Sequence, residues 1–495
     1  MELDKKTCEQ ARLTHDARFD GRFFVGVTST GIYCRCICPA PAAKRQNVRY
    51  FPTSAAASTA GFRPCLRCRP ETAPGTPAWN GTSATVSRGL RLISEGALDE
   101  DSVEDLSMRL GVSPRHLHRL FLQHLGASPI TVAQTRRLHF AKQLISDTDL
   151  SMMQVAMASG FQSIRRFNAT FSSLYGRTPT ELRRVHKTAA STTEAGKYVF
   201  RLAYRPPYDW KALLAFLAAR ATPGVEAVVG GAYRRSIVFD GRQGALEVRQ
   251  LKNAHTLEAH VFYPDPARLL QIVTRVRAMF DVAADPAVIA RTFRHDPLLA
   301  PHLKRHAGLR VPGAWDGFEL AVRAILGQQV TVRCATTLAG RLVRAFGEPL
   351  TCSNTLGLTH VFPQPAVLAK AKLTGLPQAR ALSIRSLAQA TLEGQMTFDN
   401  RLPLNELLTR LTSIKGIGDW TAHYVAMRAL GDPDAFPASD LVLLRTAGEV
   451  KSLKPAALLK RAETWRPWRA YAAMLLWRTA TDAQMKHKHT VKTKR

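Results

Sequence analysis

The stretch Gly416-Ile-Gly-Asp-Trp-Thr-Ala-His-Tyr424 and the downstream sequence Phe436-Pro-Ala-Ser-Asp440 carry the most information about the fold. Two glycines in a tight turn that opens a helix expose backbone N–H groups. Those groups, together with the positive end of the helix dipole, suit a phosphate. A lone carboxylate, Asp440, follows one loop later. A phosphate-binding turn beside a carboxylate would suit an enzyme that acts on a base in a DNA strand.

The composition points to a polyanionic partner. The chain has 495 residues, of which 45% are hydrophobic, as in ordinary globular proteins. That length allows about three or four domains of ~100–200 residues each. The 69 Lys and Arg residues outnumber the 38 Asp and Glu residues, which gives a net charge of +31. A field of this sign attracts nucleic acids, so we expect double-stranded DNA as a partner.

Targeting signals are not visible in the sequence. No apolar run approaches the ~20 residues that a membrane span needs, and the N-terminus lacks the apolar stretch of a secretory signal. We therefore expect a cytoplasmic, nucleoid-associated bacterial protein with no membrane partner. Five of the eight cysteines fall between Cys34 and Cys68. Clustered cysteines in a cytoplasmic chain favour a metal site over disulfides.

The periodicity and the linkers predict a multidomain, predominantly α-helical chain. Turn-forming and small polar residues mark linkers at 70–81 and 187–197. The expected sections are a small zinc-bound α+β domain at 1–75, an all-α domain with two helix-turn-helix units at 82–186, an α+β domain at 198–285, an all-α domain at 286–485 and a disordered basic tail at 486–495.

The cysteines form two close pairs, Cys34-x-x-x-Cys38 and Cys65-x-x-Cys68. Four thiolates at this spacing make a tetrahedral Zn²⁺ site, and a section with a thin core needs the metal to fold. Cys36 lies between the first two and leaves the choice of ligands open. Zinc-bound thiolates are also nucleophiles, although the spacing alone favours a structural site.

The residues around these cysteines resemble the Ada-type methylphosphotriester repair domain. The resemblance rests on Phe24-Val-Gly-Val-Thr-Ser-Thr-Gly-Ile-Tyr-Cys34-Arg and Gly61-Phe-Arg-Pro-Cys65-Leu-Arg-Cys68. In that family a zinc-bound cysteine irreversibly takes a methyl group from a phosphotriester of the DNA backbone. The resemblance implies that Cys34 is the acceptor and that Cys38, Cys65 and Cys68 complete the zinc site. Cys36 stands where the family usually has another residue, often proline.

Two segments of the second section predict helix, glycine turn and helix. The first is Val103-Glu-Asp-Leu-Ser-Met-Arg-Leu-Gly111-Val-Ser113-Pro-Arg-His-Leu-His-Arg-Leu-Phe121, and the second runs from Met153 through Gly160 and Ser163 to Phe171. Ser113 can cap a helix, and Pro114 suits its first position. A helix after such a turn is the one that enters a major groove.

This section resembles the AraC-type DNA-binding domain, including the ending Phe171-x-x-x-Tyr175-Gly-Arg-Thr-Pro179. The resemblance implies that segments 113–123 and 163–173 read DNA and that the chain activates transcription with RNA polymerase as a partner. The exposed candidates are Arg115, His118, Arg119, Arg165, Arg166 and Asn168. The alternative for each is a phosphate contact or a solvated charge.

The segment Leu411-Thr-Ser-Ile-Lys-Gly416-Ile-Gly418-Asp-Trp420-Thr-Ala resembles the helix-hairpin-helix of DNA glycosylases. The sequences from Gly431 to Asp440 and from Trp465 to Trp477 narrow the match to AlkA-type 3-methyladenine glycosylases. Two upstream motifs, Arg205-Pro-Pro-Tyr-Asp-Trp210 and Ala324-Ile-Leu-Gly-Gln-Gln-Val330, belong to the same resemblance, which covers about 198–478.

The resemblance assigns roles within this section. An alkylated purine is already cationic, so the enzyme mainly stabilises an oxocarbenium-like sugar and admits water, and one carboxylate serves both purposes. By the family pattern that carboxylate is Asp440, whereas Asp432 and Asp434 do not match the motif position. The turn at Gly416 and Gly418 would hold the DNA strand.

The base pocket and the wedge follow from the same pattern. Trp420, Tyr424 and Trp477 match the aromatic residues of the family's base pocket, which would receive a flipped base. Glycosylases with lyase activity carry a lysine where Trp420 stands, so water attack is expected. Gln329 matches the residue that replaces the flipped base in the duplex, a leucine in some members.

Together these features predict an alkylation-repair enzyme that also senses damage and regulates transcription. One alternative is a transcription regulator whose glycosylase half is degenerate. Another is a glycosylase whose N-terminal zinc is purely structural.

Overall fold

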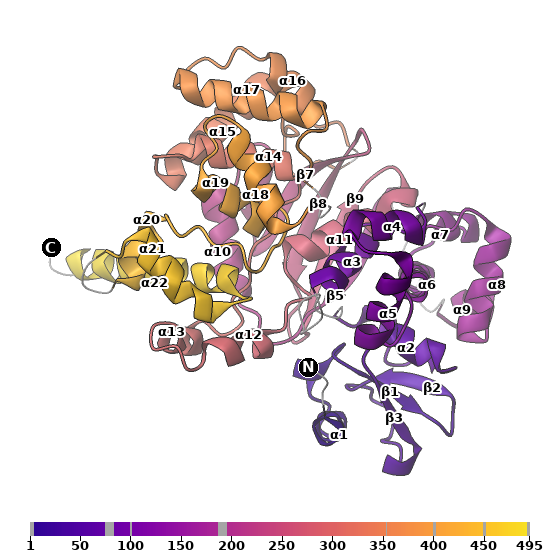
Figure 1. Cartoon of the computed structure of the whole chain (residues 1–495). Helices are drawn as coiled ribbons and strands as arrows, with labels where there is room; N and C mark the ends of the chain where they lie inside the picture. The colour runs from indigo at the N-terminus through magenta and orange to yellow at the C-terminus, as the bar shows by residue number, and fades with distance from the viewer. Residues whose placement is uncertain are drawn as a thin grey trace.

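The computed structural model describes residues 4–74, 84–99, 101–186, 196–352, 354–398, 402–448 and 452–492. Figure 1 shows several helical bodies and two small sheets, so the prediction of a multidomain, predominantly helical chain is confirmed. The N-terminal section lies at one end of the molecule, and the last helices lie on the opposite side of the larger sheet.

The N-terminal section is a four-stranded sheet flanked by two short helices. Strand β1 pairs antiparallel with β2 and β3, and β2 pairs parallel with β4. The elements are α1 Lys5–Leu13, β1 Phe24–Val27, β2 Ile32–Arg35, β3 Val48–Phe51, α2 Ser54–Thr59 and β4 Arg63–Pro64. The core consists of two small clusters, one around Phe24, Tyr33 and Phe51. So thin a core agrees with the expectation that a metal helps this section to fold.

The second section contains the two predicted helix-turn-helix units, joined by the long helix α6. Its helices are α3 Ala84–Ser94, α4 Val103–Leu110, α5 Pro114–Leu125, α6 Pro129–Asp147, α7 Met152–Ala158, α8 Ile164–Tyr175 and α9 Pro179–His186. Ser113 and Ser163 cap α5 and α8 through their hydroxyl groups. Gly111 ends α4 with a φ of 71°, a conformation that favours glycine. The predicted turns and cap are therefore confirmed.

A five-stranded antiparallel sheet with the order β5-β9-β8-β7-β6 follows. Its strands are β5 Lys197–Ala203, β6 Glu226–Val229, β7 Ala232–Phe239, β8 Arg242–Gln250 and β9 Thr256–Phe262. Two helices, α10 Trp210–Arg220 and α11 Leu269–Met279, share a buried core with this sheet. That core continues into the second helix-turn-helix unit, where the rings of Phe140 and Phe200 stack at 5.9 Å.

The C-terminal section is helical. Its helices are α12 Pro286–Phe293, α13 Ala300–Arg305, α14 Gly317–Leu326, α15 Val332–Phe346, α16 Pro365–Lys370, α17 Gln378–Leu392, α18 Leu404–Ser413, α19 Asp419–Arg428, α20 Leu441–Ala447, α21 Pro455–Ala462 and α22 Arg469–Lys492. The prediction of a disordered tail was wrong for residues 486–492, which extend α22. No Gly or Pro interrupts that stretch, so its charge alone does not end the helix. Residues 493–495 lie outside the described residues.

Candidate functional site

The hairpin turn between α18 and α19 requires glycine at its centre. Gly416 has a φ of 89°, and a Cβ there would lie 1.9 Å from Oγ of Ser383. Gly418 precedes α19, and a Cβ there would meet nothing within 4 Å. Within the described residues, no hydrogen bond engages the N–H groups of Gly416 and Gly418. The turn therefore presents backbone donors at a helix N-terminus, the arrangement that binds a phosphate.

Asp440 lies at the start of α20, where four N–H groups converge on its carboxylate. Oδ1 accepts hydrogen bonds of 2.9 Å from the backbone of Val442 and Leu443. The indole of Trp477 donates to Oδ1 at 3.0 Å, and the indole of Trp420 donates to Oδ2 at 2.8 Å. These donors fix the orientation of the carboxylate and stabilise its negative charge.

The three predicted pocket aromatics lie together beside this carboxylate. The rings of Trp420 and Tyr424 stack at 5.2 Å with an interplanar angle of 8°, and Trp477 meets Tyr424 edge-on at 6.3 Å. All three side chains are half-buried, as is Asp440. The geometry therefore brings the predicted carboxylate and the predicted aromatics into one site.

Sequence reasoning missed two arginines that border this site. Arg428 donates a hydrogen bond of 2.7 Å to the hydroxyl of Tyr424. Arg220, from α10, lies 3.8 Å over the ring of Phe216, and its positive charge acts on Tyr424. Burial raises the pKa of Tyr424, but Arg428 and Arg220 outweigh it, so that the pKa is lowered. The motif at 205–210 ends at the first residue of α10, so the glycosylase resemblance did not indicate a role for Arg220 at the end of that helix.

The two competing carboxylates have structural partners. Oδ1 of Asp432 accepts backbone hydrogen bonds from Asp434 and Ala435 at 2.9 and 3.0 Å. Asp434 pairs with Arg469 at 2.8 Å and also with Arg466. Both carboxylates hold the loop that leads to Asp440 rather than line the aromatic site.

Gln329 lies exposed in the turn between α14 and α15, with a φ of 56° that is uncommon for a residue other than glycine. Its neighbour Gln328 was not predicted. The Gln328 amide donates to the carbonyl of Gly416 at 2.9 Å and to Oγ1 of Thr421 at 3.1 Å. Through Gln328, the turn that carries the predicted wedge is therefore hydrogen-bonded to the hairpin.

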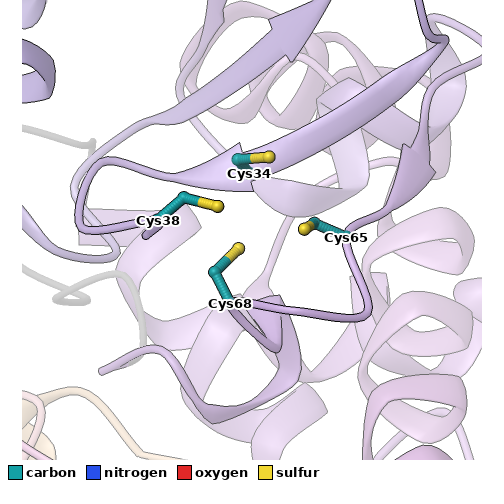
Figure 2. Close-up of side chains that lie close together, drawn as sticks. All are labelled: Cys34, Cys38, Cys65 and Cys68. Carbon is teal, nitrogen blue, oxygen red and sulfur yellow. The ribbon is translucent and has the colours of Figure 1, made fainter. Parts of the chain in front are cut away.

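The four cysteines of the N-terminal section also converge. Their sulfur atoms lie within 4.8 Å of one another, and Figure 2 shows Cys34, Cys38, Cys65 and Cys68 pointing toward a common centre. Tetrahedral zinc with Zn–S bonds of ~2.3 Å needs sulfur atoms about 3.8 Å apart, which this arrangement fits after a small contraction.

Two neighbouring groups refine the ligand choice. The backbone N–H of Arg35 donates to Sγ of Cys68 at 3.3 Å, a bond that stabilises a thiolate. Cys36 is 1% exposed and donates instead to the carbonyl of Asp16 at 3.5 Å. Burial raises the pKa of the Cys36 thiol. Cys36 therefore lies outside the four-sulfur cluster.

The helices α5 and α8 present the predicted DNA-contacting residues to solvent. Arg115, His118, Arg119, Arg165, Arg166 and Asn168 are all exposed. Leu117, Phe121, Phe167 and Phe171, on the opposite faces, are fully buried.

None of the helices in the described ranges has the length and apolar character to cross a membrane.

Family models match most of the chain in consecutive segments. They are the metal binding domain of Ada at residues 7–71, a helix-turn-helix domain at 106–185, the AlkA N-terminal domain at 199–316 and the HhH-GPD superfamily of base excision DNA repair proteins at 322–470. Over 97% of both chains, the protein is 40% identical to a probable bifunctional transcriptional activator/DNA repair enzyme AlkA of Mycobacterium tuberculosis. The chain belongs to this bifunctional AlkA family.

Two further comparisons concern the C-terminal half of this AlkA-family chain. It is 32% identical to DNA-3-methyladenine glycosylase 2 of Escherichia coli over 57% of this chain and 97% of that protein. A 3-methyladenine DNA glycosylase structure from Archaeoglobus fulgidus matches with a TM-score of 0.50 and 23% identity, over 57% of this chain and 98% of that one, which shows a shared fold. The chain therefore carries a DNA glycosylase domain and a DNA-binding domain, and DNA is its partner.

Proposed function

We propose that residues 198–485 remove alkylated purines of the 3-methyladenine type from DNA by hydrolysis. The observation that carries this proposal is the carboxylate of Asp440 held between the indoles of Trp420 and Trp477. The Escherichia coli relative bears the name of a 3-methyladenine glycosylase, and we extend that activity to this chain.

The chemistry follows from the residues. The turn at Gly416 and Gly418 would hold a phosphate while Gln329 fills the space left by the flipped nucleotide. A cationic base would stack on the aromatic rings, at ~0.5–2 kcal/mol per contact. When the bond from C1′ to the base nitrogen breaks, its electron pair leaves with the base. Asp440 stabilises the sugar cation and orients the water that bonds to C1′, and the proton of that water passes to solvent.

We propose further that residues 1–75 act as a methylphosphotriester sensor with zinc as the metal. Bound zinc would keep the sulfur of Cys34 deprotonated at neutral pH. That sulfur bonds to the methyl carbon of the phosphotriester, the carbon–oxygen bond breaks, and the DNA phosphate leaves as a diester anion. Loss of the thiolate charge would reduce repulsion from DNA phosphates. Residues 82–186 would then bind a promoter and activate transcription with RNA polymerase.

One experiment tests both halves. The full chain is incubated with DNA treated with a methylating agent, and released bases and protein mass are measured together. We expect free 3-methyladenine and a mass increase of one methyl group on the peptide that contains Cys34. A mass increase without base release would support a regulator with a degenerate glycosylase half. Base release without a mass increase would support a structural zinc site.

A further inference from the structure

Helix α6 contacts the N-terminal section, both helix-turn-helix units and the section that carries the larger sheet. Arg137 binds Asp99, in the loop that leads into the first helix-turn-helix unit, at 2.8 Å. Phe140 stacks on Phe200 of β5, and the buried Leu144 belongs to the core of the second unit. Figure 1 shows α6 among the helices α3–α9, above the strands of the N-terminal section. A change in the position of α6 would therefore reach both helix-turn-helix units.

The residue before Cys34 makes the first contact between the cysteine section and α6. Tyr33 is fully buried, and its hydroxyl lies 2.9 Å from Nε2 of His139. Its ring packs edge-on against Phe24 at 5.9 Å. Burial lowers the pKa of His139 to about 4, so the ring is neutral at physiological pH and shares a hydrogen bond with the Tyr33 hydroxyl. Two uncharged side chains therefore connect the residue next to Cys34 with α6.

The residues after Cys68 make the second contact. Glu71 pairs with Lys142 at 2.9 Å, and both side chains are almost completely buried. Arg69 bridges Glu71 and Asp147 at 3.1 Å each. A buried ion pair is stable only while its geometry is kept, because either charge alone in the interior is strongly disfavoured. The chain that carries Cys68 is therefore held to the C-terminal half of α6.

We propose that Tyr33, Arg69 and Glu71 are positioning residues that clamp α6, so that the state of the metal site sets the position of the helix joining the two DNA-binding units. The Tyr33–His139 contact is the first arm of this clamp, and the contacts of Arg69 and Glu71 with α6 are the second. Both arms begin within three residues of a predicted metal ligand. They end on α6 at His139, Lys142 and Asp147. The inference rests on the proposed metal site but not on base excision.

Hydrogen–deuterium exchange of the full chain with bound zinc, and again after chelation, tests the clamp. Removal of zinc should free the segments around Cys34 and Cys68, release both arms and speed exchange in the C-terminal half of α6 about tenfold or more. The peptide of α17, inside the glycosylase core, serves as the internal reference. Unchanged exchange in α6, with faster exchange around the cysteines, would overturn the proposal.

Variants test the arms directly. The double variant Y33F/D147A removes one bond from each arm and leaves the buried Glu71–Lys142 pair intact. We expect it to retain zinc, as metal analysis would check, to exchange faster in α6 than the zinc-bound parent, and to show a smaller further increase after chelation.

The matched control is Tyr50→Phe. The Tyr50 hydroxyl binds Glu9 within the same section, so this variant should respond to zinc removal as the parent does. If the double variant fails to hold zinc, His139→Leu removes the first arm from the α6 side. A zinc response equal to that of the parent in both clamp variants would refute the clamp.

Discussion

The indole nitrogen of Trp420 donates a 2.8 Å hydrogen bond to Oδ2 of Asp440, across twenty residues of sequence. The ring of Trp420 also stacks on Tyr424. One side chain therefore both shapes the base pocket and orients the carboxylate, so stacking and charge stabilisation are coupled. The first two predictions separate these roles.

Asp440→Asn should leave DNA binding intact and reduce base release by several orders of magnitude. The amide keeps the size of the side chain but cannot offset the developing positive charge on the sugar. Release of 3-methyladenine under single-turnover conditions measures the effect. Asp432→Asn is the matched control, because an asparagine oxygen can still accept the two backbone hydrogen bonds of Asp432. Asp434 is unsuitable as a control because it pairs with Arg469 and Arg466. Release by Asp440→Asn at the parent rate would refute the assignment.

Trp420→Phe should keep the stacked pocket and lose the bond to Asp440. A hydrogen bond to a charged group contributes about 1.5–3 kcal/mol, which corresponds to a roughly 10- to 150-fold lower rate of base release. Binding of DNA that contains an abasic site should change little, because the hairpin is untouched.

If borohydride traps a covalent adduct between the parent protein and DNA, hydrolysis by water is the wrong mechanism.

The parts of the fold that sequence predicted are those with local causes. Gly416 needs a positive φ, and Ser113 caps the helix that begins at Pro114. These signals act over a few residues and can be read from the chain. The tail at 486–492 misled because charge was taken as a sign of disorder, although nothing in that stretch breaks a helix.

The parts that sequence did not predict depend on contacts between distant segments. Arg220 reaches Tyr424 from another section, and Gln328 reaches Gly416 across 88 positions. Tyr33 meets His139 across 106 positions. Nothing in the spacing of these residues distinguishes them from surface or core residues, because their roles arise only when the sections pack. The resemblance supplied Asp440 and the aromatic residues, but not the groups that hold them.

Cys65→Ser should abolish stoichiometric zinc binding, whereas Cys36→Ser should retain it. Cys65 belongs to the four-sulfur cluster, and the thiol of Cys36 points to the carbonyl of Asp16. Metal analysis of the purified chains measures both. Peptide mapping after exposure to methylphosphotriester DNA should place the methyl group on Cys34 in the Cys36→Ser variant as in the parent. A methyl group on Cys36 in the parent would show that the acceptor is misassigned.

Arg115→Ala and Arg165→Ala should each cost about 1–3 kcal/mol at a specific promoter site if these exposed side chains reach base edges. Binding to random DNA should then change little. Fluorescence anisotropy at several salt concentrations distinguishes the two kinds of contact. An equal loss on random DNA, with a smaller dependence on salt, would identify them as phosphate contacts.

His139 should make the stability of the chain sensitive to acid. Burial lowers its pKa from 6.5 to about 4, with Glu71 opposing the shift. Because the folded pKa is depressed, the neutral ring contributes stability above pH 6.5, and this contribution is lost as the pH falls through about 4. His139→Gln keeps a hydrogen-bonding side chain beside Tyr33 but does not titrate. Between pH 7 and pH 4, the Tm of the parent should therefore fall further than that of His139→Gln, as scanning calorimetry would measure. Parallel curves for the two proteins would mean that His139 is not held neutral in the folded chain.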